Sequence, residues 1–98
     1  TEIIKLTVTG KRIKQAREHI GVSQTQFGEL AGLNKRDANI KMNQYEVGGT
    51  VPKYNFVLKL SAASGLPEYF FYINDDVIAN SLIEAVNAKT TWVVDLAL

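Results

Sequence analysis

Side chains with the chemistry of catalysis are scarce in this chain. It has no cysteine and a single histidine, His19, which has no pair of acidic residues beside it. Gly48 and Gly49 lack the lysine and serine of a phosphate-binding loop. Asp75 and Asp76 lack a third acidic residue at the spacing of a metal site, and helix capping explains them better. The sequence therefore predicts a protein that is not an enzyme and that needs no metal, cofactor or small-molecule ligand.

Basic side chains are concentrated in the first half of the chain, although the formal net charge is only +1. Residues 1–53 hold nine lysines and arginines against five acidic residues, whereas residues 54–98 hold two against five. A basic front half is typical of a surface that binds nucleic acid. Ordinary scatter of charge is the competing interpretation.

The composition is that of one folded domain over residues 1–98. The 98 residues are 46% hydrophobic and 21% charged, values at which a chain of this length can build a core. No apolar run approaches the roughly 18 residues of a membrane span, and the first ten residues do not resemble a secretory signal. We therefore expect a cytoplasmic protein that has no contact with a membrane.

Hydrophobic spacing and glycine positions predict four helices between residues 11 and 65. The first covers residues 11–20 and ends at Gly21, and the second begins at a capping box formed by Ser23 and Gln26. The third begins at Asn34 or Asp37 and ends at residues 48–49. The fourth follows Pro52 and ends at Gly65.

The two ends of the chain have less regular patterns. A short helix is expected over Glu68–Tyr72, and a C-terminal helix over residues 75–88, capped by Asp75 or Asp76. Residues 1–9 alternate polar and apolar side chains, and residues 90–98 are rich in β-branched and aromatic ones, so each predicts a short strand. These strands can pair with each other or with a second subunit.

Short helices that end at glycines are typical of a helix-turn-helix bundle. Residues 11–72 resemble the Xre/Cro family of phage repressors and restriction–modification controller proteins. The resemblance is carried by the segments GKRIKQAREHIGVSQTQFGELAGL, MNQYEVGGTVP and LKLSAASGLPEYFF. It implies a lambda-repressor-like bundle of five to six helices. The chain departs from the family because Glu46 follows Gly32 by fourteen residues, about four more than usual, so the third helix or the turn before it is longer.

The resemblance implies that the third helix enters the major groove of double-stranded DNA. Amide side chains can bond to adenine edges, and lysine can donate to guanine. Counting back from Glu46, the residues expected to read bases are Asn39, Ile40, Lys41, Asn43 and Gln44. A merely solvated polar face is the competing interpretation. The residues expected to contact the DNA backbone are Gln24, Thr25, Lys35, Arg36, Lys53 and Arg12.

The resemblance also implies a buried ion pair between Arg17 and Glu46, which would set the angle of the third helix. Arg17 shares an apolar stripe with Ile13 and Ile20, which is an unfavourable place for an unpaired charge. Family members commonly form dimers through the region after the fourth helix. The residues expected at a dimer interface are Tyr69, Phe71, Trp92, Val94 and Leu96.

Together these observations predict a sequence-specific transcriptional regulator that binds a palindromic operator as a homodimer. The alternative is a protein–protein interaction module, such as an antitoxin or an adaptor, whose terminal strands bind a partner. The low net charge and Val47, where many relatives have a cation, favour this alternative.

Overall fold

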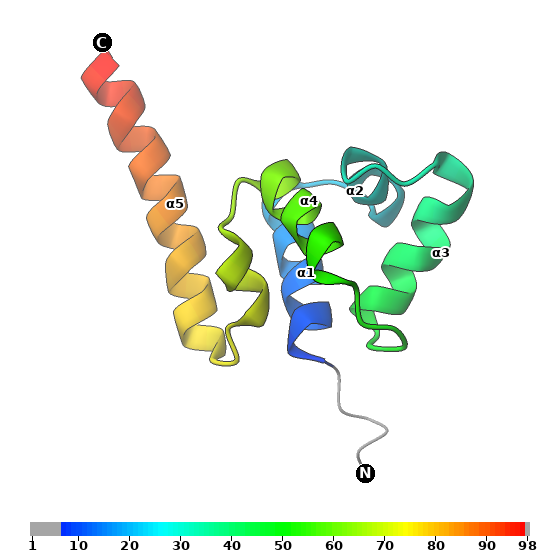
Figure 1. Cartoon of the computed structure of the whole chain (residues 1–98). Coiled ribbons are helices and arrows are strands. Elements are labelled where there is room, and N and C mark those ends of the chain that lie inside the picture. The colour runs from blue at the N-terminus through cyan, green and yellow to red at the C-terminus, as the bar shows by residue number, and fades with distance from the viewer. Residues whose placement is uncertain (1–6, 98) are drawn as a thin grey trace.

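The chain folds into a bundle of helices. A computed structural model describes residues 7–97, with side chains described for residues 7–88. Within this part the helical segments are α1 (Val8–Ile20), α2 (Gln24–Leu30), α3 (Lys35–Glu46), α4 (Tyr54–Ser64), the 3-10 helix η2 (Glu68–Tyr72) and α5 (Asp76–Ala97). The predicted mainly helical fold of five to six helices is confirmed. Figure 1 shows α1 in the middle of the bundle, with α3 and α5 on opposite sides of it.

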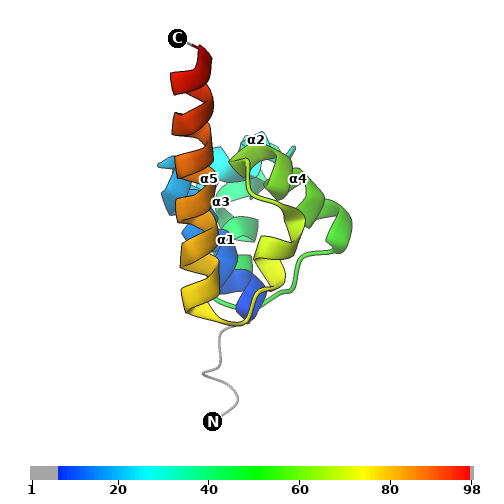
Figure 2. The ribbon, with the colours of Figure 1, turned by 90° about the vertical axis from the view of Figure 1, so that its left-hand side faces the viewer.

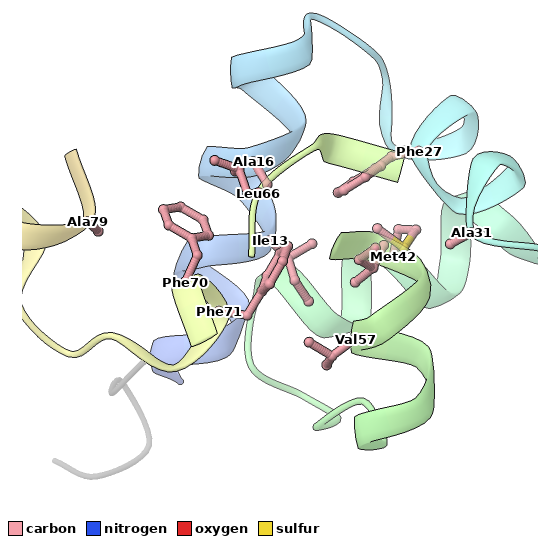
Figure 3. Close-up of a cluster of buried hydrophobic side chains, with 11 residues drawn as sticks. Ile13, Ala16, Phe27, Ala31, Met42, Val57, Leu66, Phe70, Phe71 and Ala79 are labelled. Atoms are coloured by element: carbon pink, nitrogen blue, oxygen red, sulfur yellow. The ribbon is translucent and has the colours of Figure 1, made fainter. Parts of the chain in front are cut away.

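One apolar core joins the four helices α1, α2, α3 and α4 with the 3-10 helix η2. Each helix contributes large side chains that are fully buried (Figure 3), because apolar residues recur on one stripe of each helix. Phe70 and Phe71 both enter this core and meet edge to face, with ring centroids 5.3 Å apart. The other large buried side chains are Ile13, Phe27, Met42, Val57, Leu60 and Leu66.

The predicted N-terminal strand is wrong where the structure can test it. Residues 1–6 lie outside the described residues, but Val8 and Thr9 already belong to α1. Thr7 caps this helix, because its hydroxyl accepts the backbone N–H of Gly10 at 2.9 Å. The helix thus begins three residues before the predicted start.

The predicted C-terminal strand is also wrong. α5 begins at Asp76 and continues through residues 90–97 to Ala97 instead of ending near residue 88. It runs past the rest of the bundle (Figures 1 and 2). A strand needs a neighbouring strand for its backbone hydrogen bonds, whereas a helix satisfies them internally. Residues 7–97 contain no strand that could pair with this segment, so the weak β propensity of its side chains does not decide its structure.

Candidate nucleic-acid interface

Side-chain caps fix the N-terminal ends of both α2 and α3. The Ser23 hydroxyl accepts the backbone N–H of Gln26 at 3.1 Å, and the Gln26 side chain accepts the backbone N–H of Ser23 at 2.9 Å. This is the predicted capping box. Gly32 turns the chain with φ of 99°, and Asn34 then caps α3 by accepting the N–H of Asp37 at 2.9 Å. Of the two predicted alternatives, Asn34 is therefore the residue that caps α3. The extra residues lengthen α3 rather than the turn before it.

Two glycines let α3 approach its neighbours closely. A Cβ atom at Gly28 of α2 would lie 2.8 Å from Cβ of Ala38 and 3.0 Å from Cγ of Met42. A Cβ atom at Gly10 of α1 would lie 2.4 Å from the carbonyl oxygen of Tyr45. The distances to Cβ of Ala38 and to the carbonyl oxygen of Tyr45 are too short for a real Cβ atom. Only glycine at these positions allows α3 to pack in its observed place.

α3 has a buried inner face and an exposed outer face. Ala38, Met42 and Glu46 point inward. The five residues predicted to read bases are all exposed, as expected for residues on the other side of the helix: Asn39, Ile40, Lys41, Asn43 and Gln44. Figure 1 shows α3 on the edge of the bundle, where no other helix covers its outer side.

The predicted ion pair between Arg17 and Glu46 is present. Nε of Arg17 donates to Oε2 of Glu46 at 2.7 Å, and Nη2 donates to Oε1 at 3.2 Å. Nη1 of Arg17 also donates to the carbonyl of Val22, just before α2. The hydrogen bond to Glu46 raises the pKa of Arg17 above its usual value, although burial opposes this shift. One guanidinium thus connects α1, the start of α2 and the end of α3.

Gln24 extends this network to the outer face of α3. Its Nε2 donates to Oε1 of Glu46 at 3.1 Å and lies 3.4 Å from Oδ1 of Asn43. Asn43 is exposed, whereas the Glu46 side chain is only 5% exposed. Gln24, which is itself held by the buried carboxylate of Glu46, therefore orients the amide of Asn43.

The other predicted backbone contacts lie in different settings. Lys35 and Arg36 are exposed in the first turn of α3, and Lys53 is exposed at the N-cap of α4. Thr25 is half-buried in the first turn of α2. The exposure and position of these four residues do not test whether they contact the DNA backbone, so that assignment remains a prediction.

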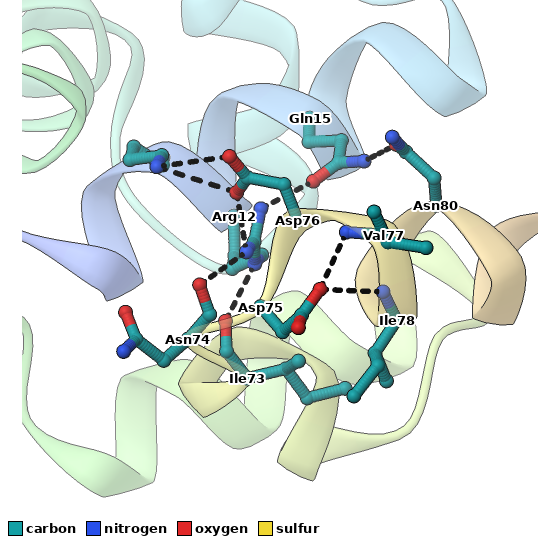
Figure 4. Close-up of polar contacts among 10 residues, drawn as sticks. Arg12, Gln15, Ile73, Asn74, Asp75, Asp76, Val77, Ile78 and Asn80 are labelled. Atoms are coloured by element: carbon teal, nitrogen blue, oxygen red, sulfur yellow. Dashed lines mark hydrogen bonds and ion pairs between the residues drawn. The ribbon is translucent and has the colours of Figure 1, made fainter.

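Arg12 is not a surface cation, and the prediction that it contacts the DNA backbone is wrong. The residue is only 2% exposed. Its guanidinium donates to the carbonyls of Ile73 and Asn74 at 2.8 and 3.3 Å, and to Oδ1 of Asp76 at 2.7 Å (Figure 4). A further bond at 2.9 Å reaches the side chain of Gln15. Arg12 therefore holds the start of α5 against α1.

Sequence reasoning missed the polar cluster around Arg12. Lys11 also pairs with Asp76, at 3.3 Å, and Gln15 bonds to Asn80 of α5 (Figure 4). The hydrogen bond from Arg12, and then the contact with Lys11, lower the pKa of Asp76. The available signal was the spacing of Arg12, which precedes the core residue Ala16 by one helical turn.

The residues predicted at a dimer interface divide into three groups. Tyr69 is exposed on η2, as an interface residue of a free subunit should be. Phe71 is fully buried in the core, so its assignment to an interface is wrong. Its side chain points toward α1 instead of outward (Figure 3). Trp92, Val94 and Leu96 lie in the part of α5 for which side chains are not described.

Asp75 is a helix cap, as predicted. Its Oδ1 accepts the N–H groups of Val77 and Ile78 at 2.8 and 3.2 Å. The described residues contain no group of three or more potential metal ligands. Among residues 7–97, no helix combines the length and the apolarity needed to cross a bilayer.

Comparison with solved structures relates this fold to that of a known regulator. No family model matches the chain, and no curated protein matches it either. Membership of the Xre/Cro family therefore remains a prediction. Among solved structures, the chain is similar to the crystal structure of the transcriptional regulator BswR, with a TM-score of 0.73 and 27% sequence identity. The match covers 89% of this chain and 92% of that one, so the two proteins share a fold over nearly their whole lengths.

Proposed function

We propose that this protein is a transcriptional regulator that binds double-stranded DNA sequence-specifically through the outer face of α3. The observation that carries the proposal is the division of α3 into a buried side fixed by α1 and α2 and an exposed side rich in amides. A helix held in this way can enter a major groove without rearranging. The similarity in fold to the transcriptional regulator BswR supports the same function.

Each exposed side chain has a role that fits its chemistry. Asn39, Asn43 and Gln44 bond to base edges, with adenine as the favoured base, and Lys41 donates to guanine. The contacts that fix the register go to phosphates and carry no sequence information. We assign these to Gln24, Thr25, Lys35, Arg36 and Lys53.

The active species in this proposal is a homodimer on a palindromic operator. Two-fold symmetry of the protein matches two half-sites about one or two helical turns of DNA apart. Tyr69 and the C-terminal half of α5 are the interface that we propose, because this half runs beyond the bundle (Figures 1 and 2). α3 lies on the other side of α1 and stays accessible in such a dimer.

The test is selection of binding sites from randomised duplex DNA at about 150 mM salt, where non-specific phosphate binding is weak. We expect a palindrome whose half-site spacing reports the geometry of the dimer. A Gln44→Ala variant should lose about 1–3 kcal/mol on the selected site and less on random DNA. Glu29→Gln, an exposed change on α2, is the matched control and should retain the preference.

Failure of this selection with a folded protein would refute the proposed function. The interaction-module alternative would then be favoured, although it has lost the C-terminal strand on which it depended. An equal loss on selected and random DNA for Gln44→Ala would show that this residue does not read bases.

A further inference from the structure

The outer face of α3 contains one large apolar side chain. Ile40 is 60% exposed, and it lies among polar residues. Successive residues of an α-helix are about 100° apart, so Ile40 lies on the side opposite both Ala38 and Met42, two residues away on either side. It therefore occupies the middle of the outward stripe, where a helix in a groove comes closest to the bases.

The neighbours of Ile40 place it inside the proposed reading surface. Arg36 lies one turn before it, and Asn43 and Gln44 lie one turn after it, all exposed. A single exposed apolar residue is normal on a protein surface. Here it lies one turn before two amides that suit adenine, so it would be placed over a base pair beside those that the amides contact.

The chemistry of the major groove offers one group that Ile40 can bind. The four bases present hydrogen-bond donors and acceptors there, and thymine adds its 5-methyl group as the apolar feature. Isoleucine is β-branched and is held in one main rotamer in a helix, so its methyl groups have a nearly fixed position. A fixed apolar group selects by contact and excludes water from the methyl.

We propose that Ile40 is a specificity-determining residue that recognises the 5-methyl group of a thymine in each half-site. This inference rests on the proposed function, and it adds the identity of the base at the centre of the reading surface. It predicts that the operator has a thymine at this position, next to the bases that the amides of Asn43 and Gln44 contact within the half-site.

The experiment replaces each thymine of the selected operator in turn by deoxyuridine. Deoxyuridine keeps every hydrogen-bonding group of thymine and lacks only the methyl. At one symmetric position we expect affinity to fall about fourfold for one substituted half-site and about fifteenfold for two, from the burial of one methyl group each. The Ile40→Ala variant should bind the thymine and deoxyuridine operators with equal affinity.

The matched control is Leu30→Ala. Leu30 is 59% exposed and lies on α2, so this substitution removes the same kind of side chain from another surface. This variant should keep the full preference for thymine. Thermal unfolding of both variants checks that they fold, which we expect because alanine is a good helix former at an exposed position.

Three outcomes separate the claims. If the wild type keeps its selected sequence but binds every deoxyuridine operator normally, the inference on Ile40 is wrong and the proposed function remains. If Ile40→Ala still distinguishes thymine from deoxyuridine, another residue reads the methyl and the inference is also wrong. If no sequence is selected at all, the proposed function itself fails.

Discussion

Replacing Arg17 by methionine tests the network that holds α3. The change removes both donors to the Glu46 carboxylate, at 2.7 and 3.2 Å, and leaves that carboxylate with Gln24 at 3.1 Å. Oε2 of Glu46 then has no donor, although the side chain is only 5% exposed. An uncompensated buried charge of this kind costs about 3–5 kcal/mol. This is a large part of the roughly 5–15 kcal/mol that stabilises a typical domain.

The assay is urea unfolding followed by circular dichroism at pH 7. With a slope of about 1.5 kcal/mol per M, the midpoint of Arg17→Met should fall by about 2–3 M. Adding Glu46→Gln should restore part of the loss, because the neutral amide has no buried charge and can still accept from Gln24. The two changes should therefore be strongly non-additive.

Two results would refute this reasoning. A loss below about 1 kcal/mol for Arg17→Met would show that the pair behaves like an exposed ion pair. Losses that add fully in the double variant would show that Arg17 and Glu46 stabilise the fold independently.

Three further changes test other parts of the structure. Gly28→Ala should lower the stability in thermal unfolding by about 1–3 kcal/mol, because the new methyl overlaps α3; Gly49→Ala, whose Cβ atom would have 3.7 Å to its nearest neighbour, should cost far less. Asp76→Asn should weaken the attachment of α5 at pH 7, since the lowered pKa of the carboxyl means that its ionised form is favoured in the folded state. In acid titrations of unfolding, the difference between wild type and this variant should persist down to pH 3.8, the usual pKa of an aspartate, and disappear as pH falls through the lower folded-state pKa. A constant difference across this range would contradict the ion pair. Lys53→Gln should reduce the salt dependence of DNA binding by about one phosphate contact, whereas Lys59→Gln, an exposed lysine outside the proposed surface, should leave the slope unchanged.

The sequence predicted the helices of the central region well because their signals are local. The capping box at Ser23, the glycine in the turn before α3 and the apolar stripes lie within one or two helical turns of each residue they affect. Arg17 was predicted correctly because it lies on an apolar stripe and because the resemblance supplied Glu46 as its partner.

Contacts between distant segments were harder to predict. Arg12 has the same charge as the exposed Lys14, but its acceptors come from Ile73, Asn74 and Asp76, more than sixty residues later. The spacing of Arg12 from Ala16 indicates the inner side of α1, but no local pattern identifies acceptors that lie so far away in the sequence. The helix over residues 90–97 was missed for the opposite reason: its composition favours a strand locally, but a strand also needs a partner elsewhere in the chain.

The two-sided construction of α3 has a consequence for how such a protein can change over generations. Its inner residues and the glycines that face them carry the stability of the fold, whereas exposed positions such as Asn39 and Gln44 contribute little to it. Substitutions at those outer positions should therefore yield folded proteins with altered preferences, so that new regulatory circuits can arise from few mutations. Asn43 is the exception, because its hydrogen bond to Gln24 ties it to the interior, and it should be the slowest of these positions to diverge.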